Sequence, residues 1–369
     1  MIICRTPYRM SFFGGGTDYH NWYQEHGGAV LATTINHHCY VMCRFLPPFF
    51  ENKHRIVWSK IEHADSPAEI EMPPVRAILD DLNIQRGVEI QHMGDLPARS
   101  GLGSSSAFTV GLLNSIYALR GIMSTKKQLA CEAVHIERDI LKENVGVQDQ
   151  ISTAYGGLNK IEIMQNGEFV VQPVILPQER RQALQKHMLL FFTGVSRTAS
   201  TIAADKIKSI PKKQSQLHEM HKMVDIGLNI LTQGGDLEDF GRLLHESWML
   251  KRSLSKNISP EFIDDIYAKA YNAGAIGGKL LGAGGGGFMM FFAKPEHHQA
   301  IMDALKELLI IPVEFENSGS QIVFNDPRQY SQTSLVRRDY IHLQDENIKD
   351  EESLKIINKK RKSKISIVG

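Results

Sequence analysis

The chain has 369 residues, of which 42% are hydrophobic and 22% are charged, and its formal net charge is +1 at pH 7. These values are typical of a globular protein large enough for two domains. The near-neutral charge argues against nucleic acid or a membrane surface as partner, and no apolar run approaches the roughly 18 residues that span a bilayer. The segment Met1–Pro7 lacks the features of a signal peptide, so we expect a cytoplasmic protein.

Apolar periodicity predicts the order of the elements along the chain. In the first half it predicts strands near 2–6, 29–45, 54–60, 87–95, 157–164 and 168–175, and helices near 18–26, 73–83, 104–120, 126–142 and 147–155. In the second half, after the apolar run Met188–Phe192, it predicts helices between 197 and 273, a strand pair at 276–293, a helix near 296–309 and a strand pair at 311–324. We therefore predict an α+β protein with one domain over 1–185, a second over 186–326 and a charged, solvated tail over 327–369.

Four cysteines are too few for a disulfide framework in a chain of this size. His37, Cys39 and Cys43 lie close together in sequence and raise the question of a metal site. On the strand predicted there, the two cysteines would be about 13 Å apart, which is too far for both to bind one ion. We interpret them as structural residues.

A glycine- and serine-rich segment, Leu96–Ala107, lies between a predicted strand and the helix predicted over 104–120. The first N–H groups of a helix have no intrahelical partner and carry partial positive charge, so such a loop favours a phosphate group. The loop lacks the lysine of a Walker A motif. The alternative is a helix that is capped by a serine.

Two further glycine clusters indicate backbone that a ligand can approach closely. Gly14–Gly16 follow the first predicted strand and precede Asp18, whose carboxylate is suited to accept hydrogen bonds from a sugar or to cap the next helix. The run 282–287 satisfies G-x-G-x-x-G, but a strand rather than a helix is predicted after it. We interpret 276–293 as a hairpin that lines a ligand.

Glu137 lies at the edge of the apolar face of the helix predicted over 126–142, twelve residues before Asp149. A carboxylate at that position is costly unless it is paired or binds a cation. An exposed Glu137 is the alternative that the spacing leaves open.

The three glycine motifs, in this order, resemble those of the GHMP family of small-molecule kinases: Pro7–Tyr19, Leu96–Ala107 and Lys279–Gly287. The resemblance covers about residues 1–325. It implies a ribosomal-S5-domain-2-like N-terminal domain, a ferredoxin-like C-terminal domain and an active site between them, with ATP and Mg²⁺ as cofactors.

The resemblance also implies roles for individual residues. Asp149 matches the general base, Arg9 the arginine beside the reacting hydroxyl, and Ser105 and Glu137 the magnesium ligands. The residues expected to bind ATP are Gly101, Leu102, Gly103, Ser104, Ser105 and Ser106, with Trp58 and Ser59 on the adenine side. Those expected to bind substrate are Gly15, Gly16, Thr17, Asp18, Tyr19, Arg252, Lys251, Arg197, Gly284 and Gly285.

Gly15 and Gly16 stand where galactokinases have Glu-His, which argues against galactose as substrate. The glycine strings and the segment Thr193–Arg197 resemble family members that act on D-glycero-D-manno-heptose 7-phosphate, on a route to GDP-heptose and surface polysaccharide. The expected reaction is phosphorylation of the anomeric hydroxyl to give the 1,7-bisphosphate. The substrate's own phosphate needs cations, for which we consider Arg252, Lys251, Arg197 and Lys279.

Three alternatives remain open. The first is an L-fucose-type or other C1 sugar kinase of the same family. The second is a non-catalytic sensor with this fold, and the third is a phosphate-binding module whose tail recruits partners.

Overall fold

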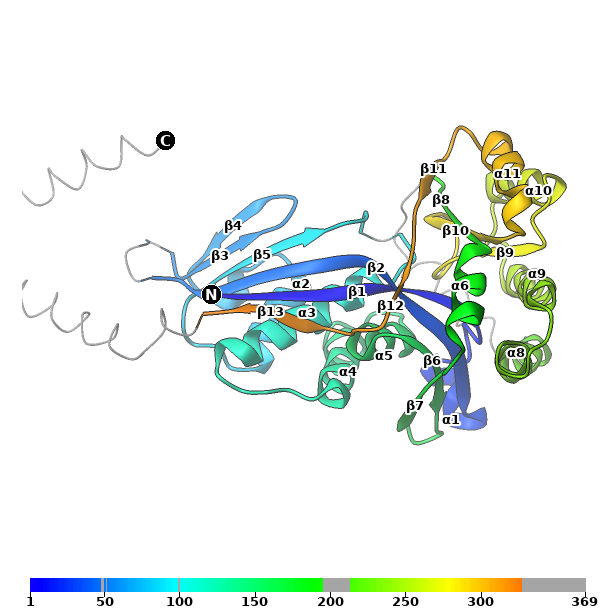
Figure 1. The fold of residues 1–369 in the computed structure, drawn as a ribbon. Helices are drawn as coiled ribbons and strands as arrows, with labels where there is room; N and C mark the ends of the chain where they lie inside the picture. Colours follow the sequence, from blue (N-terminus) through cyan, green and yellow to red (C-terminus); the bar gives the residue numbers. More distant parts are fainter. Residues whose placement is uncertain (48–49, 51, 99, 195–212, 327–369) are drawn as a thin grey trace, which may run out of the picture. The chain divides into compact units, whose positions relative to one another are not determined.

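The computed structural model describes residues 1–47, 50, 52–98, 100–194 and 213–326. Residues 1–46 and 52–325 form one compact unit, drawn in Figure 1. The mixture of helices and sheets in it confirms the predicted α+β class. Arg197 and the predicted tail over 327–369 lie outside the described residues.

The first sheet is organised around two long antiparallel strands, β1 (Ile2–Phe13) and β2 (Gly28–Phe45). The order of its main strands is β13-β1-β2-β5-β3-β4, in which β13 is Gln321–Asn325, while β6 pairs with β2 and β7 with β6. Their bounds are β3 (His54–Val57), β4 (Ile61–Ala64), β5 (Val88–Gly94), β6 (Leu158–Ile163) and β7 (Phe169–Pro173). The prediction of a first strand over 2–6 was too short: residues 7–13 continue β1, because they pair with β2 and are buried.

Helices pack on this sheet and on one another. They are α1 (His20–His26), α2 (Pro73–Asp81), α3 (Ser104–Leu119), α4 (Lys126–Val134) and α5 (Gln148–Tyr155), with a short 3₁₀ turn η1 (Pro67–Glu69) before α2. Helix α3 contacts β1 and β2, and α4 and α5 contact α3 (Figure 1). The helix predicted over 126–142 is α-helical only to Val134 and continues as a π-helix, η2 (His135–Ile140). π-helical turns often occur at functional sites, and this turn contains Glu137.

The second sheet has the order β11-β8-β10-β9, with every neighbouring pair antiparallel. Its strands are β8 (Met188–Phe192), β9 (Gly277–Leu280), β10 (Phe288–Phe292) and β11 (Leu309–Ile311). The accompanying helices are α8 (Gln214–Thr232), α9 (Leu237–Leu254), α10 (Glu261–Asn272) and α11 (His298–Ala304), with a 3₁₀ turn η4 (Pro295–His297) before α11. Pairing of β9 with β10 around the glycine run confirms the predicted hairpin.

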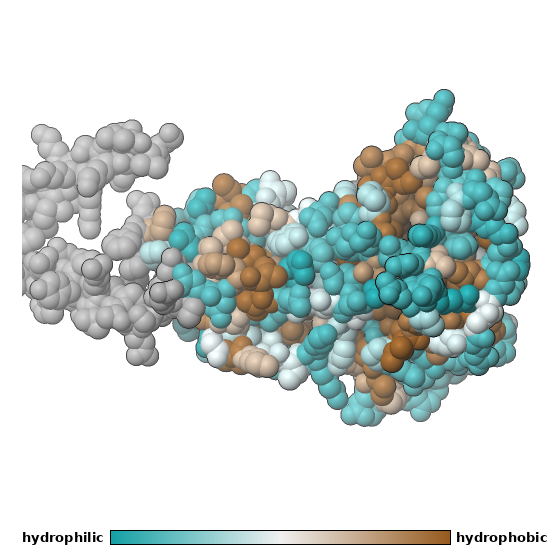
Figure 2. Space-filling view, viewed as in Figure 1, coloured by the Kyte–Doolittle hydropathy of each residue, from teal (hydrophilic) through white to brown (hydrophobic). Residues whose placement is uncertain are grey.

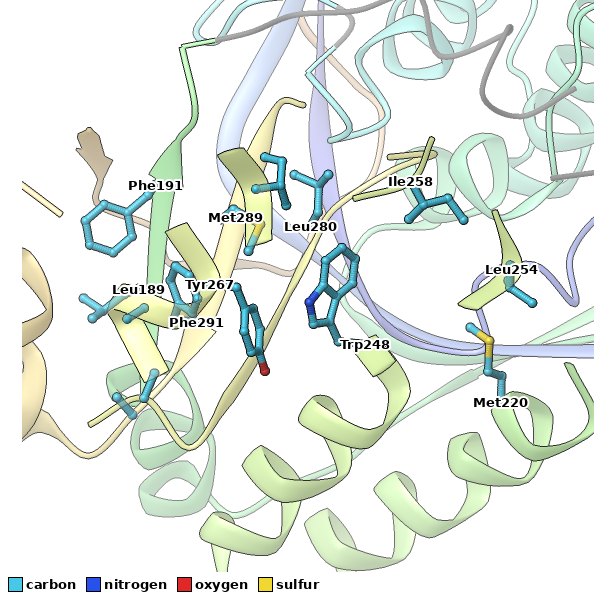
Figure 3. Close-up of a cluster of buried hydrophobic side chains, with 14 of the residues drawn as sticks. Leu189, Phe191, Met220, Trp248, Leu254, Ile258, Tyr267, Leu280, Met289 and Phe291 are labelled. Atoms are coloured by element: carbon cyan, nitrogen blue, oxygen red, sulfur yellow. The ribbon is translucent and has the colours of Figure 1, made fainter. Parts of the chain in front are cut away.

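The core on this side of the molecule is aromatic. Tyr267 from α10 lies between Trp248 of α9 and Phe291 of β10 (Figure 3), and Trp22 from α1 belongs to the same buried cluster. Helix α6 (Gln178–Lys186) was not predicted, because Leu184 is its one buried residue among those described and a single apolar position makes no periodic pattern.

The last two strands return to the first sheet. β12 (Phe315–Glu316) pairs with β2, and β13 (Gln321–Asn325) pairs antiparallel with β1. The prediction of a strand pair over 311–324 was therefore wrong, because local hydrophobicity does not specify which distant strand a segment joins.

On the face shown in Figure 2, hydrophobic residues gather near β11, where Leu309 and Ile310 are exposed. Among the described residues, none of the helices combines the length and the hydropathy needed to cross a bilayer.

Candidate active site

The glycine motifs meet through their backbones. The Arg9 amide of β1 donates a hydrogen bond to the carbonyl of Leu102 at 2.9 Å. Gly101 and Gly282 approach so closely that a Cβ on Gly101 would lie 2.5 Å from the Leu281 carbonyl oxygen, and one on Gly282 would lie 2.5 Å from the Gly101 Cα. Both have positive φ, 86° and 72°, so the contact requires glycine on both sides.

Arg9 and Asp149 form a bidentate ion pair next to this junction. Arg9 Nε and Nη2 donate to Asp149 Oδ1 and Oδ2, both at 2.7 Å, and Nη1 donates to the Gly101 carbonyl at 2.6 Å. Arg9 is 3% exposed and Asp149 is 26% exposed, so the carboxylate is held firmly but can still be reached. Burial raises the pKa of Asp149, Arg9 opposes the rise and the charge of Asp18 adds to it. The predicted base and arginine thus contact each other across 140 residues of sequence.

Glu137 is fully buried, so the alternative of an exposed Glu137 is wrong. Its Oε2 accepts hydrogen bonds from Ser106 Oγ at 2.9 Å and from Gln150 Nε2 at 2.6 Å. Its Oε1 has no hydrogen-bond partner among the described residues. Burial raises the pKa of Glu137 to about 7. A buried carboxylate oxygen without a partner among the described residues fits a hard divalent cation.

Ser106, rather than the predicted ligand Ser105, contacts Glu137, and Ser105 is exposed at the start of α3. Adjacent helical residues point about 100° apart, so only one of them can face η2. The helix is preceded at its N-cap by Gly103 in the left-handed conformation, without a side-chain cap. The alternative of a serine cap is therefore wrong, and the predicted magnesium role of Ser105 stays a prediction.

Asp18 is almost completely buried beside α5. Its Oδ1 accepts a hydrogen bond from the Gly16 amide at 2.8 Å, and its Oδ2 accepts one from Gln148 Nε2 at 3.0 Å. A Cβ on Gly146 would lie 1.9 Å from Asp18 Oδ2, so only glycine fits at position 146 beside this carboxylate. Asp18 does not cap α1, whose N-cap residue is Tyr19.

Thr17 and Tyr19 support this loop from inside. The Thr17 hydroxyl donates to the Gly14 carbonyl at 2.9 Å and to the Ala29 carbonyl at 2.8 Å, which ties the loop to β2. Tyr19 packs in the aromatic core with Trp22. The expectation that both residues bind substrate remains untested, and the observed contacts are structural.

Two of the predicted phosphate-binding cations are buried and bind backbone instead. Lys251 Nζ donates to the carbonyls of Leu280 and Gly282, both at 2.7 Å. Lys279 Nζ donates to the carbonyl of Phe12 at 2.7 Å. These bonds hold the glycine hairpin against β1, so the two lysines shape the site through its backbone.

Arg252 forms an ion pair with Asp264 at 2.6 Å, and each side chain is about one-third exposed. Gly284 and Gly285 pack on the loop that contains Ile258. The Gly285 amide donates a hydrogen bond to the Ile258 carbonyl at 2.9 Å, and a Cβ on Gly284 would lie 2.8 Å from the Ile258 Cα. Close packing explains both glycines without a ligand.

Trp58 and Ser59 lie in the turn between β3 and β4. Trp58 Nε1 donates to Glu62 Oε1 at 2.6 Å, and Lys60 Nζ lies 5.4 Å from the centre of the Trp58 ring system. β3 runs parallel to β5, the strand that leads into the phosphate loop. The assignment of Trp58 and Ser59 to the adenine side of the site stays a prediction.

Comparison with known proteins identifies the family. The N-terminal domain of GHMP kinases matches residues 74–157, and the C-terminal domain of GHMP kinases matches residues 228–311. The chain belongs to the GHMP kinases, and it is an ATP-dependent kinase.

The chain is 28% identical to the D-glycero-alpha-D-manno-heptose 7-phosphate kinase of Campylobacter jejuni subsp. jejuni, over 83% of this chain and 93% of that protein. It is 31% identical to the L-fucokinase/L-fucose-1-P guanylyltransferase of Bacteroides fragilis, over 56% of this chain and 22% of that protein. The crystal structure of a D-glycero-D-manno-heptose 1-phosphate kinase from Bacteriodes thetaiotaomicron matches with a TM-score of 0.73 and 24% identity, over 88% of this chain and all of that one.

Sequence reasoning missed Gln148 and Gln150, whose neutral side chains donate hydrogen bonds to Asp18 and Glu137. It placed Ser106 in the ATP-binding loop but did not foresee its contact with Glu137. Gln148 and Gln150 flank Asp149 directly, and this position beside a candidate base is the signal that was available. Which atoms they bind depends on the packing of α5 against α3 and β1.

Proposed function

We propose that this kinase transfers the γ-phosphoryl group of ATP to the anomeric hydroxyl of D-glycero-D-manno-heptose 7-phosphate, giving the 1,7-bisphosphate and ADP. The observation that carries the proposal is the Arg9–Asp149 pair beside the phosphate loop. The similarity to the heptose 7-phosphate kinase, which extends over 93% of that relative, supports the choice of sugar.

In this proposal Asp149 accepts the proton of the anomeric hydroxyl as its oxygen attacks the γ-phosphorus in line and ADP leaves. Arg9 fixes both oxygens of Asp149 and places positive charge where the hydroxyl becomes negative. The helix N-terminus at Gly103–Ser105 faces the phosphates with its amides. Positioning and charge neutralisation account for most of the rate of such reactions.

Glu137, together with Ser106 or Ser105, would hold Mg²⁺. When bound, the ion neutralises charge on the transferring phosphoryl group. Magnesium commonly uses one or two protein oxygens and takes the remainder from phosphate and water, which agrees with a single buried carboxylate at this place.

Arg252 is our candidate for the sugar's 7-phosphate. Its pair with Asp264 is partly exposed, and such pairs contribute only about 0–1 kcal/mol, so a dianionic phosphate can compete for the guanidinium. A charge-assisted contact is worth about 1.5–3 kcal/mol, which predicts a roughly ten- to hundredfold preference for the phosphorylated heptose.

The test is a coupled ADP-release screen of heptose 7-phosphate, free heptose, L-fucose and galactose. We expect the first to be preferred and galactose to be inert. Arg252→Ala should remove much of the preference, whereas Arg242→Ala, at an exposed arginine on the same helix, should keep it. Equal efficiency on phosphorylated and free heptose would reject the substrate, a preference for L-fucose would favour the fucokinase alternative, and no turnover with any sugar would favour the sensor.

A further inference from the structure

Two polar side chains close to Arg9 and Asp149 have buried atoms that no described residue satisfies. Ser11 is 5% exposed and its Oγ has no hydrogen-bond partner, and the Oε1 of Gln148 is likewise buried without a partner. Buried polar atoms in folded proteins are nearly always paired, so unpaired atoms beside a reaction centre are available to hydrogen-bond a bound molecule.

The positions of both residues follow from their elements. Side chains alternate along a strand, so Ser11 lies on the same face of β1 as Arg9, two residues earlier. Gln148 begins α5 and directly precedes Asp149. Both unpaired atoms are therefore held by the elements that hold the ion pair.

The amide of Gln148 has a defined orientation. Its Nε2 donates to Asp18 Oδ2, and a carboxylate can only accept, so the nitrogen must face Asp18. The carbonyl oxygen Oε1 is consequently an acceptor that is available for a donor such as a hydroxyl. The Ser11 hydroxyl can both donate and accept.

Gly15 leaves space between the side chains of Ser11 and Gln148. A Cβ built on Gly15 would lie 3.8 Å from Ser11 Oγ and 3.8 Å from Gln148 Nε2, both ordinary contact distances. The backbone of Gly15 has no positive φ, so neither a steric clash nor backbone strain explains glycine there. Room for a ligand explains it.

We propose that Ser11 and Gln148 are specificity-determining residues, which bind hydroxyl groups of the sugar next to the one that reacts. The inference rests on the proposed function in that the substrate is a sugar, but not on which sugar it is. Ser11 contributes its hydroxyl, Gln148 accepts through Oε1, and Asp18 is a positioning residue that orients the Gln148 amide.

The experiment compares Ser11→Ala, Gln148→Met and Gly15→Ala with the wild-type enzyme, using heptose 7-phosphate and its monodeoxy analogues. Loss of one neutral hydrogen bond predicts a roughly three- to tenfold rise in the KM for sugar, with the KM for ATP within about twofold of wild type. Gly15→Ala should fold normally and also raise the sugar KM, because its methyl group occupies the ligand's space. One monodeoxy sugar should be a poor substrate for the wild type and no poorer for Ser11→Ala.

The matched control is Ser247→Ala in α9, which removes another buried hydroxyl that has no partner among the described residues. Wild-type sugar KM in both Ser11→Ala and Gln148→Met, or an equal rise in the KM for ATP, would overturn the proposal. If the wild type accepts a different sugar, the proposed substrate fails and the same variants are measured with that sugar. If it phosphorylates none, titration calorimetry with heptose 7-phosphate decides, and absence of binding rejects both proposals.

Discussion

Asp149 and Glu137 are carboxylates twelve residues apart with opposite surroundings. Asp149 has both oxygens bound by the guanidinium of Arg9. Glu137 has one oxygen bound by two neutral side chains, and the other has no partner in the part of the chain that the structure describes. One acidic group is neutralised within the protein, and the other is not.

The difference agrees with the two roles that we propose for these carboxylates. A fixed arginine opposes the rise in the pKa of Asp149 that burial causes, and it orients the carboxylate. Burial without a cation makes the charged form costly and raises the pKa of Glu137 to about 7, so that a divalent ion is the partner that would complete the site.

The variant with the largest expected effect removes the charge of Asp149. Asp149→Asn is nearly isosteric and can still accept a hydrogen bond from Arg9, so we expect it to fold and to bind ATP nearly normally. Turnover should fall by about 10²–10⁴, the usual contribution of a positioned base. Steady-state kinetics with ATP binding measured separately will check this, and wild-type turnover would remove Asp149 from the mechanism.

The pH dependence of stability tests the other carboxylate. Because the folded-state pKa of Glu137 is raised, the folded protein holds a proton that the unfolded chain releases between about pH 4.5 and 7. The free energy of unfolding of the metal-free protein should therefore fall as pH rises through this window, by on the order of 3 kcal/mol for this group.

Glu137→Gln carries no titrating proton, so its stability should vary less over the same window. Urea unfolding at pH 5 to 8.5 in a chelating buffer gives the difference between the two proteins. Parallel curves for the wild type and Glu137→Gln would show that Glu137 titrates normally.

The magnesium dependence of the rate tests the proposed role of Glu137 directly. Glu137→Gln should raise the magnesium concentration for half-maximal rate by about tenfold or more, since a charged ligand is replaced by a neutral one. A magnesium titration of the rate at saturating ATP and sugar measures it. An unchanged midpoint would mean that Glu137 does not hold the ion.

The smallest effects concern the adjacent serines. Ser105→Ala and Ser106→Ala should each raise the magnesium midpoint by roughly fivefold, the equivalent of about 1 kcal/mol. Only Ser106→Ala should also move the pH midpoint of stability upward, because the hydrogen bond from Ser106 lowers the pKa of Glu137. A shift in Ser105→Ala instead would reverse the two assignments.

Much of this protein follows from its sequence. The order of the three glycine motifs, the alternation of strands and helices, the hairpin of β9 and β10 and the α+β class all follow from local periodicity and from glycine runs. These features depend on residues within a few positions of one another, which a sequence pattern records directly.

The tertiary structure decided what the polar groups bind. Arg9 reaches Asp149 across 140 residues, Lys251 binds carbonyls of the glycine hairpin, and the last strand joins β1 at the other end of the chain. Ser106 rather than Ser105 meets Glu137, because a π-helical turn and the rotation of α3 decide which side chain faces inward. A charge or hydroxyl takes its partner from whatever segment packs against it, and that segment is chosen by burial of the whole chain rather than by its neighbours in sequence.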